Sequence, residues 1–166
     1  MSRKSIILVA VLVLGLGLDQ VTKLLVLQNL ALGSHISIGP GFFNLVHVHN
    51  KGAAFSLLNS IPAGFTRPFF MITTGLVLGV VGYFWWRLPK TNWLAALGYS
   101  LIMAGAVGNL IDRVRLGEVV DFLDFYWGSY HWPAFNVADS LVCLGAAVLV
   151  WVILTEETTD NAPDPA

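Results

Sequence analysis

The sequence contains little charge. Lys, Arg, Asp and Glu together make up 11% of its 166 residues, whereas a soluble domain carries roughly a quarter. Hydrophobic residues reach 56%, and the mean hydropathy is +0.73. This composition excludes an ordinary soluble globular protein and indicates a membrane protein. The net charge of −1 leaves no basic stripe, so no nucleic-acid partner is expected.

Cysteine and histidine are also scarce. The only cysteine, Cys143, lies within an apolar run. A disulfide framework is therefore excluded, and a small buried apolar side chain is a better interpretation than a catalytic thiol. Among the four histidines, only His47 and His49 are close in sequence, and a metal ion would need a third and a fourth ligand. We predict neither a metal nor another cofactor.

Long apolar runs are abundant, and four of them approach the roughly 20 residues that a helix needs to cross a bilayer. The expected spans are residues 6–27, 68–86, 93–111 and 136–154. No small-residue cleavage site follows the first run, so it is expected to be a retained span and not a signal peptide. The predicted fold is an all-α membrane protein with four transmembrane helices. It forms one domain, residues 1–154, followed by a disordered acidic tail, residues 155–166.

Glycines recur within two of these spans at the spacing of helix contacts. They are Gly75 and Gly79 in the second span, and Gly105 and Gly108 in the third. We expect them to pack the helices within one bundle and not to form a dimer face. The protein is accordingly predicted to be a monomer.

Unusual polar residues gather on one membrane side, where spans one and three end and spans two and four begin. The segments on that side are DQVTK (19–23), HNKGAAFS (49–56), GNLIDRVR (108–115), VVDFLDF (119–125) and FNVAD (135–139). The opposite side carries Arg3, Lys4, the RLPK turn (87–90) and the acidic tail. The positive-inside rule makes that plainer side cytoplasmic, with both termini on it. Five basic residues on the polar side oppose this orientation: Lys23, Lys51, Arg67, Arg113 and Arg115.

The connection between the first two spans, residues 28–67, is too long for a bare turn. Its segment NLVHVHN (44–50) alternates in polarity, which is typical of a strand, and GPG (39–41) predicts a turn before it. A small extracytoplasmic β element is therefore expected between helices 1 and 2.

Charged residues at membrane depth are candidates for function. Asp19 and Lys23 lie four residues apart and can form an ion pair on one helix face. Arg113 could bind a carboxylate or a lipid phosphate, or anchor its helix at the interface. Asp121 and Asp139 stand in apolar surroundings, and no Lys or Arg lies within four residues of Asp139.

Two carboxylates that meet share a proton, and such a pair can activate a water molecule. Sequence spacing does not establish that Asp121 and Asp139 meet. Asp139 could instead be an acid that caps the last helix at its amino end, and on spacing alone that interpretation is favoured.

Five segments in order resemble the motifs of bacterial lipoprotein signal peptidase, also called signal peptidase II. They are DQVTK (19–23), NKGAAF (50–55), GNLIDR (108–113), VVDF (119–122) and FNVAD (135–139). The resemblance implies an aspartic endopeptidase of the bacterial inner membrane, with its active site at the extracytoplasmic face. Its substrates would be prolipoproteins whose Cys carries a diacylglyceryl group, cut just before that Cys, with membrane lipids as further partners.

The resemblance also assigns residues. Asp121 and Asp139 would be the catalytic pair, and Asp19 and Lys23 would form a structural polar pair. Five positions would bind substrate or support the site: Asn50, Gly52, Asn109, Arg113 and Asn136.

Three other classes of function remain open from the residues themselves. A transporter would need polar residues staggered through the bilayer, but spans two and three are nearly bare. A structural membrane protein would use the acids only as helix caps. A serine peptidase could combine Ser56 or Ser140 with Lys51, although nothing in the sequence sets a serine and a base together.

Overall fold

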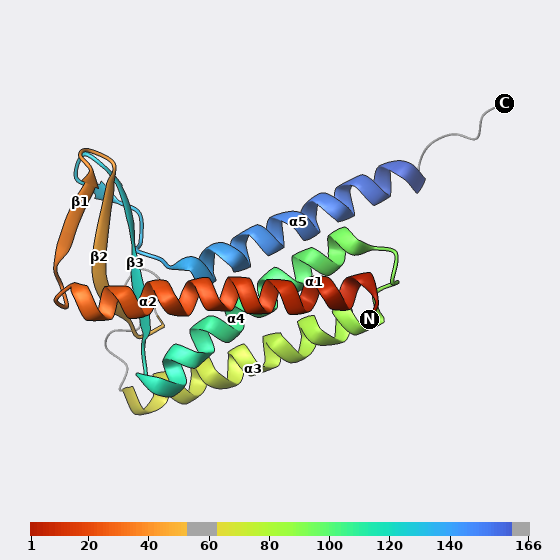
Figure 1. Ribbon diagram of the computed structural model, residues 1–166, viewed down its shortest axis with the longest axis horizontal. Helices are drawn as coiled ribbons and strands as arrows, with labels where there is room; N and C mark the ends of the chain where they lie inside the picture. Colours follow the sequence, from red (N-terminus) through yellow and green to blue (C-terminus); the bar gives the residue numbers. More distant parts are fainter. Residues whose placement is uncertain (53–62, 161–166) are drawn as a thin grey trace.

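The computed structural model describes residues 1–52 and 63–160 and consists of four helical rods with a β-sheet at one end (Figure 1). The first rod is continuous through α1 (Arg3–Val11), the π-helical turn η1 (Leu12–Leu16) and α2 (Gly17–Asn29). The others are α3 (Ala63–Arg87), α4 (Trp93–Arg115) and α5 (Val137–Asp160). All four are long and apolar enough to cross a membrane, which confirms the predicted four-span fold.

Helix α5 extends beyond the expected end of the last span. It continues to Asp160, six residues past Leu154, because the segment from Thr155 to Asp160 contains neither Gly nor Pro to stop it. Residues 161–166 lie outside the described part of the chain. The domain boundary at residue 154 stays a prediction.

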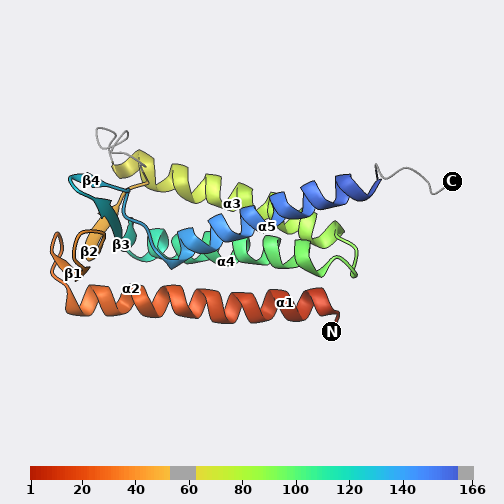
Figure 2. The same cartoon turned by 90° about the horizontal axis from the view of Figure 1, so that it is seen from above.

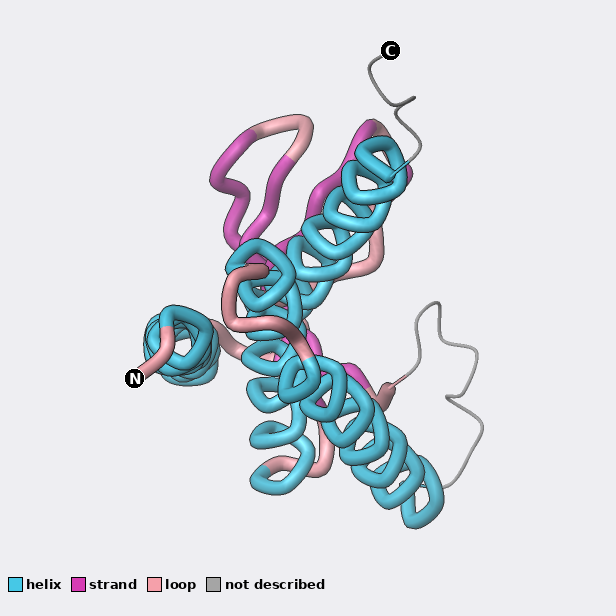
Figure 3. Tube along the Cα trace, turned by 90° about the vertical axis from the view of Figure 1, so that its right-hand side faces the viewer, coloured by secondary structure: helices cyan, strands magenta, loops and turns pink. Residues whose placement is uncertain are grey.

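Helix α4 is the central rod and packs most closely against α5. A Cβ atom added to Gly98 would meet Leu149, and one added to Gly145 would lie 2.6 Å from the Gly98 carbonyl oxygen. Small residues therefore let these two helix backbones approach each other. Viewed end-on in Figure 3, the first rod stands to one side of the other helices, and α4 is its main neighbour.

The expected packing role of the glycines is right for α4 and wrong for α3. Side-chain atoms at Gly105 and Gly108 would collide with α5 and with Asp19. Gly75 and Gly79 have nothing within 4 Å of the point that a Cβ atom would occupy, because they lie on a face of α3 that no other described element covers. Spacing reveals that two glycines share a helix face but not whether that face is packed.

The sheet contains four antiparallel strands in the order β1-β2-β3-β4. Their bounds are β1 (His35–Gly39), β2 (Phe43–Asn50), β3 (Val119–Trp127) and β4 (Tyr130–His131). The strand predicted over residues 44–50 and the turn before it are confirmed. The sheet is larger than expected, because β3 follows α4 along the chain and pairs with β2 over a long sequence separation.

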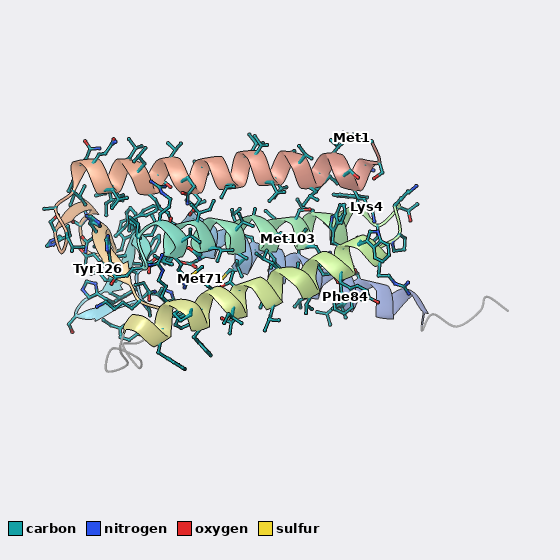
Figure 4. The ribbon with its side chains drawn as sticks, turned by 90° about the horizontal axis from the view of Figure 1, so that it is seen from below. Met1, Lys4, Met71, Phe84, Met103 and Tyr126 are labelled. Carbon is teal, nitrogen blue, oxygen red and sulfur yellow. The ribbon has the colours of Figure 1, made fainter. Side chains whose placement is uncertain are left out.

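The sheet lies at one end of the rods, and the N-terminus and the end of α5 lie at the other (Figures 1 and 2). Figure 4 shows the same polarity, with Tyr126 in the sheet and Lys4 at the far end. There the buried Lys4 ammonium donates to the carbonyl oxygens of Trp85, Trp86 and Leu88. It thereby supplies a donor to carbonyl groups where α3 ends.

A small apolar cluster fixes the sheet on the helices. Val120 and Phe122 of β3 are buried against Val26 of α2. Asp121 lies between these two anchored residues, so its backbone is fixed in space by both neighbours.

Candidate active site

Asp121 is a buried carboxyl group in β3, with only 2% of the residue exposed. Its two oxygen atoms accept hydrogen bonds from two amides. Asn50 Nδ2, at the end of β2, donates to Oδ2 at 2.9 Å, and Asn136 Nδ2 donates to Oδ1 at 2.7 Å. Burial raises the pKa of Asp121 to about 7, and the nearby charge of Asp139 adds to the rise. The group can therefore hold a proton near neutral pH.

Asp139 lies in the first turn of α5 and forms a reciprocal cap with Asn136. The Asp139 backbone N–H donates to Asn136 Oδ1 at 2.9 Å, and the Asn136 backbone N–H donates to Asp139 Oδ2 at 3.2 Å. This is a capping box, which satisfies N–H groups at the start of a helix. The capping interpretation of Asp139 is thus confirmed by its contacts.

Capping does not remove Asp139 from the site, because its second oxygen faces α4. Asn109 Nδ2 donates to Asp139 Oδ1 at 2.7 Å. The Asn136 side-chain amide, which binds Asp121, also donates to Asn109 Oδ1 at 3.2 Å. The structure therefore brings Asp121 and Asp139 to the same residue, Asn136, through its side chain and its backbone respectively.

A buried cation supports this arrangement. Lys23 is 2% exposed, and its ammonium lies 2.9 Å from Asp19 Oδ2 and 2.8 Å from Asp112 Oδ2. Its third contact is a hydrogen bond to Asn109 Oδ1 at 3.1 Å. The expected Asp19–Lys23 ion pair is present, and Asp112 completes it as a second carboxylate.

The two acids of this cluster also hold backbone groups on neighbouring elements. Asp19 Oδ1 accepts from the Ala138 N–H at 2.8 Å, and Asp112 Oδ2 accepts from the Val120 N–H at 3.2 Å. They thereby hold the residue just before Asp139 and the residue just before Asp121. Sequence reasoning missed the role of Asp112. Its position three residues after Asn109, on the same side of a helix, was the available signal.

Gly52 and Arg113 both border the ring of Phe70 on α3. The Arg113 guanidinium carbon lies 5.3 Å from the ring centroid, and Nη1 donates to the Asn109 carbonyl at 3.2 Å. Gly52 has a φ of +105°, and a Cβ atom there would collide with the same ring. Its N–H donates to Asn50 Oδ1 at 2.8 Å, which orients that amide toward Asp121.

A pocket of about 200 Å³ opens beside this constellation, between α3, α4 and α5. Mostly apolar groups surround it, together with Asn109 and Arg113. Its lining residues are Thr73, Thr74, Val77, Ile102, Ala106, Asn109, Arg113 and Val142. The pocket therefore borders Asn109, the residue that binds Asp139.

The alternative sites considered from sequence do not assemble among the described residues. Ser140 Oγ donates to the Asn136 carbonyl, and Lys51 pairs loosely with Glu118 at 3.7 Å; Ser56 lies outside the described residues. His47 Nε2 is 3.1 Å from His49 Nε2. Within residues 1–52 and 63–160, no group of three His, Cys, Asp or Glu side chains could hold a metal ion.

Comparisons with known proteins agree on one family. The model of the family "Signal peptidase (SPase) II" matches residues 10–155. The chain is 49% identical over 140 residues to the lipoprotein signal peptidase of Geobacter metallireducens, covering 84% of this chain and 85% of that protein. The corresponding enzyme of Vibrio cholerae is 48% identical over 134 residues, covering 80% and 77%.

A solved structure described as a bacterial membrane enzyme has the same fold. It superimposes with a TM-score of 0.82 at 32% sequence identity, and the match covers 96% of this chain and 93% of the other. A second bacterial membrane enzyme matches with a TM-score of 0.78 at 34% identity, covering 89% and 92%.

Proposed function

The chain belongs to the signal peptidase II family, and we propose that it cleaves lipid-modified prolipoproteins with Asp121 and Asp139 as its catalytic pair. The protein is a peptidase of a multi-pass inner-membrane type. The observation that carries the catalytic assignment is the double contact of Asn136, whose side-chain amide binds Asp121 and whose backbone binds Asp139.

The two carboxyl groups have different surroundings, and we therefore assign them different roles in the reaction. Asp121 is buried, and its raised pKa lets it keep a proton near pH 7. Asp139 stands at the amino end of α5, where the helix dipole favours negative charge. In this proposal Asp121 enters the reaction protonated, and Asp139 enters as the carboxylate.

The reaction then follows general acid–base chemistry. Asp139 takes a proton from a water molecule, whose oxygen forms a bond to the scissile carbonyl carbon. Asp121 gives its proton to the carbonyl oxygen, and a neutral tetrahedral diol results. When the C–N bond breaks, Asp139 passes its proton to the leaving nitrogen, and one diol hydroxyl returns a proton to Asp121. Water is consumed, and both side chains end in their starting states.

Lys23 has a positioning role in this scheme. Asn109 Oδ1 accepts from both Lys23 Nζ and Asn136 Nδ2. With its oxygen held in this way, the Asn109 amide must present its N–H group to Asp139. A buried ammonium thus sets the orientation of the amide that holds the proposed base.

The substrate enters from the lipid side. The mostly apolar pocket between α3, α4 and α5 can accept an apolar side chain of the signal helix or part of an acyl chain, and Arg113 at the pocket wall can bind an ester or peptide carbonyl. The bond that is cut lies just before the lipid-bearing Cys. The sheet and the catalytic pair lie on the extracytoplasmic side, and both termini lie in the cytoplasm. In this proposal the protein acts as a monomer.

Two substitutions test the catalytic pair. Asp121→Asn and Asp139→Asn should each lower prolipoprotein cleavage by at least about a hundredfold, the usual contribution of a general acid or base. Asp124→Asn is the matched control, because Asp124 is a buried acid of the same strand that binds Asn44 and His131 instead. Full cleavage by either of the first two variants would refute the pair.

A second measurement tests the substrate class. Purified protein should cleave a prolipoprotein carrying diacylglyceryl on its Cys and leave the unlipidated form intact. Equal cleavage of both substrate forms would contradict the proposed lipid specificity but not the assignment of the catalytic pair.

A third measurement tests the serine-peptidase alternative. Ser140→Ala should keep its activity, because the Ser140 hydroxyl only bonds back to the Asn136 carbonyl.

A further inference from the structure

A second apolar groove lies on the opposite side of α4 from the proposed active site. It measures about 380 Å³ and is formed where the first rod meets α4. Its lining residues are Leu12, Val13, Leu16, Gly17, Gln20 and Ile111. Residues two apart on a helix point about 200° apart. Ile111 therefore faces away from Asn109, which contacts Asp139.

The shape of the groove comes from the first rod. Its middle turn, η1, is π-helical, and such turns alter the local helix surface. Gly17 follows directly and has nothing within 4 Å of where a Cβ would lie. Beyond this point α2 contacts α4 far less than α1 does. An opening is therefore left at a depth where hydrocarbon, and not water, surrounds the helices.

A cation stands at the extracytoplasmic end of the groove. Arg115 lies one helical turn beyond Ile111, about 6 Å along α4 and on the same face. Its side chain is exposed, and Nη1 makes a long contact of 3.5 Å to Gln20 Oε1. Among the side chains that the structure describes, those of residues 1–52 and 65–155, no carboxylate is in ion-pair distance of Arg115. Glu118, three residues later, faces His49 and Lys51.

We propose that this groove is a binding site for a membrane glycerophospholipid, with an acyl chain along Leu12–Gln20 and the phosphate on Arg115. The charge complementarity selects the ligand. An arginine that has no carboxylate partner at the membrane interface binds a phosphate through two parallel N–H groups. The apolar lining below Arg115 accepts an acyl chain.

The bound lipid would act on the first rod. Gln20 Nε2 also donates to Asp19 Oδ2 at 3.0 Å and to Asp112 Oδ1 at 3.2 Å. A phospholipid on Arg115 and Gln20 would therefore hold α2 against α4 beside the acids that bind Lys23. The site thus joins the surrounding membrane to the proposed machinery without forming part of it.

Native mass spectrometry of delipidated protein in detergent tests the site. The probe is dioleoylphosphatidylglycerol, and dioleoylglycerol is the matched ligand without phosphate. We expect one phosphatidylglycerol to bind each chain, at least about tenfold more tightly than dioleoylglycerol, as one lost charge-assisted hydrogen bond implies. Arg115→Gln should abolish this preference. Gly17→Leu, which fills the groove, should weaken the binding of both ligands.

Gly75→Leu is the matched control for Gly17→Leu, because Gly75 also has open space around it but does not line this groove. It should bind both ligands as the unmodified protein does. Arg115→Lys, which keeps the charge, should retain part of the preference and provides a second variant if Arg115→Gln does not fold. Equal binding of both ligands, or phosphatidylglycerol binding that is unchanged by Arg115→Gln and Gly17→Leu, would overturn the proposal. A dimer that Gly17→Leu dissociates would also overturn it, since a second chain would then occupy the groove.

Discussion

Replacing Asp121 by Asn should remove activity and, at alkaline pH, stabilise the folded protein. The reason is that a buried carboxyl group is costly to ionise. Asp121 is 2% exposed, and burial raises its pKa from an ordinary value of 3.8 to about 7. In the unfolded chain the same group ionises freely near 4. Asn cannot ionise, so the free-energy cost of burying its side chain does not change with pH.

The sign and size of the effect follow from proton linkage. Between pH 4 and pH 7 the folded state binds a proton that the unfolded state has released. The free energy of unfolding of the unmodified protein therefore falls as the pH rises through this range. The two pKa values, 3.8 and about 7, correspond to a loss on the order of 4 kcal/mol by pH 8. Below pH 4 the loss is absent, because both states are protonated.

Comparison across pH isolates this ionisation from other consequences of the substitution. At pH 4 the unmodified protein carries a neutral carboxyl group at this position, and the variant carries a neutral amide; both face the amides of Asn50 and Asn136. Any difference in hydrogen bonding is therefore already present at pH 4. The additional advantage of Asp121→Asn at pH 8 reports the charge alone.

Thermal unfolding in detergent, followed through the fluorescence of the six tryptophans, gives the measurement. For a chain of this size about 4 kcal/mol corresponds to a shift in Tm of roughly 10 °C. The quantity to compare is the Tm of Asp121→Asn minus the Tm of the unmodified protein. This difference should be larger at pH 8 than at pH 4 by roughly 10 °C. Asp124→Asn should show no such gain. Melting curves of Asp121→Asn and the unmodified protein that shift in parallel from pH 4 to pH 8 would refute the reasoning.

Three further predictions concern activity. The kcat/KM for a lipidated peptide should fall about tenfold per pH unit above pH 7, as Asp121 loses its proton; a rate that stays constant to pH 9 would contradict this. Lys23→Met should lower cleavage about a hundredfold by freeing the Asn109 amide, whereas Lys4→Met, at the far end of the rods, should change only the Tm; equal activity of the two would exclude the positioning role. Gly52→Ala and Gly33→Ala both strain a residue with positive φ and should cost stability, about 1 kcal/mol or more. Only Gly52→Ala should lose cleavage activity, because its Cβ also meets Phe70. An equal loss of activity in both variants would mean that backbone strain, and not the contact with Phe70, is the cause.

The parts of the fold that could be predicted depend on local patterns. Four long apolar runs define the spans, and the alternation of residues 44–50 defines a strand, because burial along one element leaves a pattern in its own sequence. Strand β3 was missed, since its partner β2 lies about seventy to eighty residues earlier in the chain and VVDF looks like an apolar loop beside a membrane. The uncovered face of Gly75 and Gly79 was likewise not available from their spacing.

The site shows the same limit at the level of single residues. The Asp19–Lys23 ion pair follows from a four-residue spacing on one helix. The contacts that extend it, from Lys23 to Asp112 and Asn109, join two different spans. No periodicity within either helix encodes how the two are rotated toward each other. Only the order of several motifs along the chain pointed to a shared location.

The two interpretations of Asp139 that sequence left open describe the same electrostatics. A capping acid and a catalytic base both need a carboxylate that remains charged in apolar surroundings. The capping box supplies a backbone N–H and the positive end of α5 to one oxygen, while Asn109 holds the other. Asp121, in the middle of a strand, has no helix end to favour its charge. The asymmetry of the proposed pair therefore arises from secondary structure, because one carboxyl group begins a helix and the other is buried in a sheet.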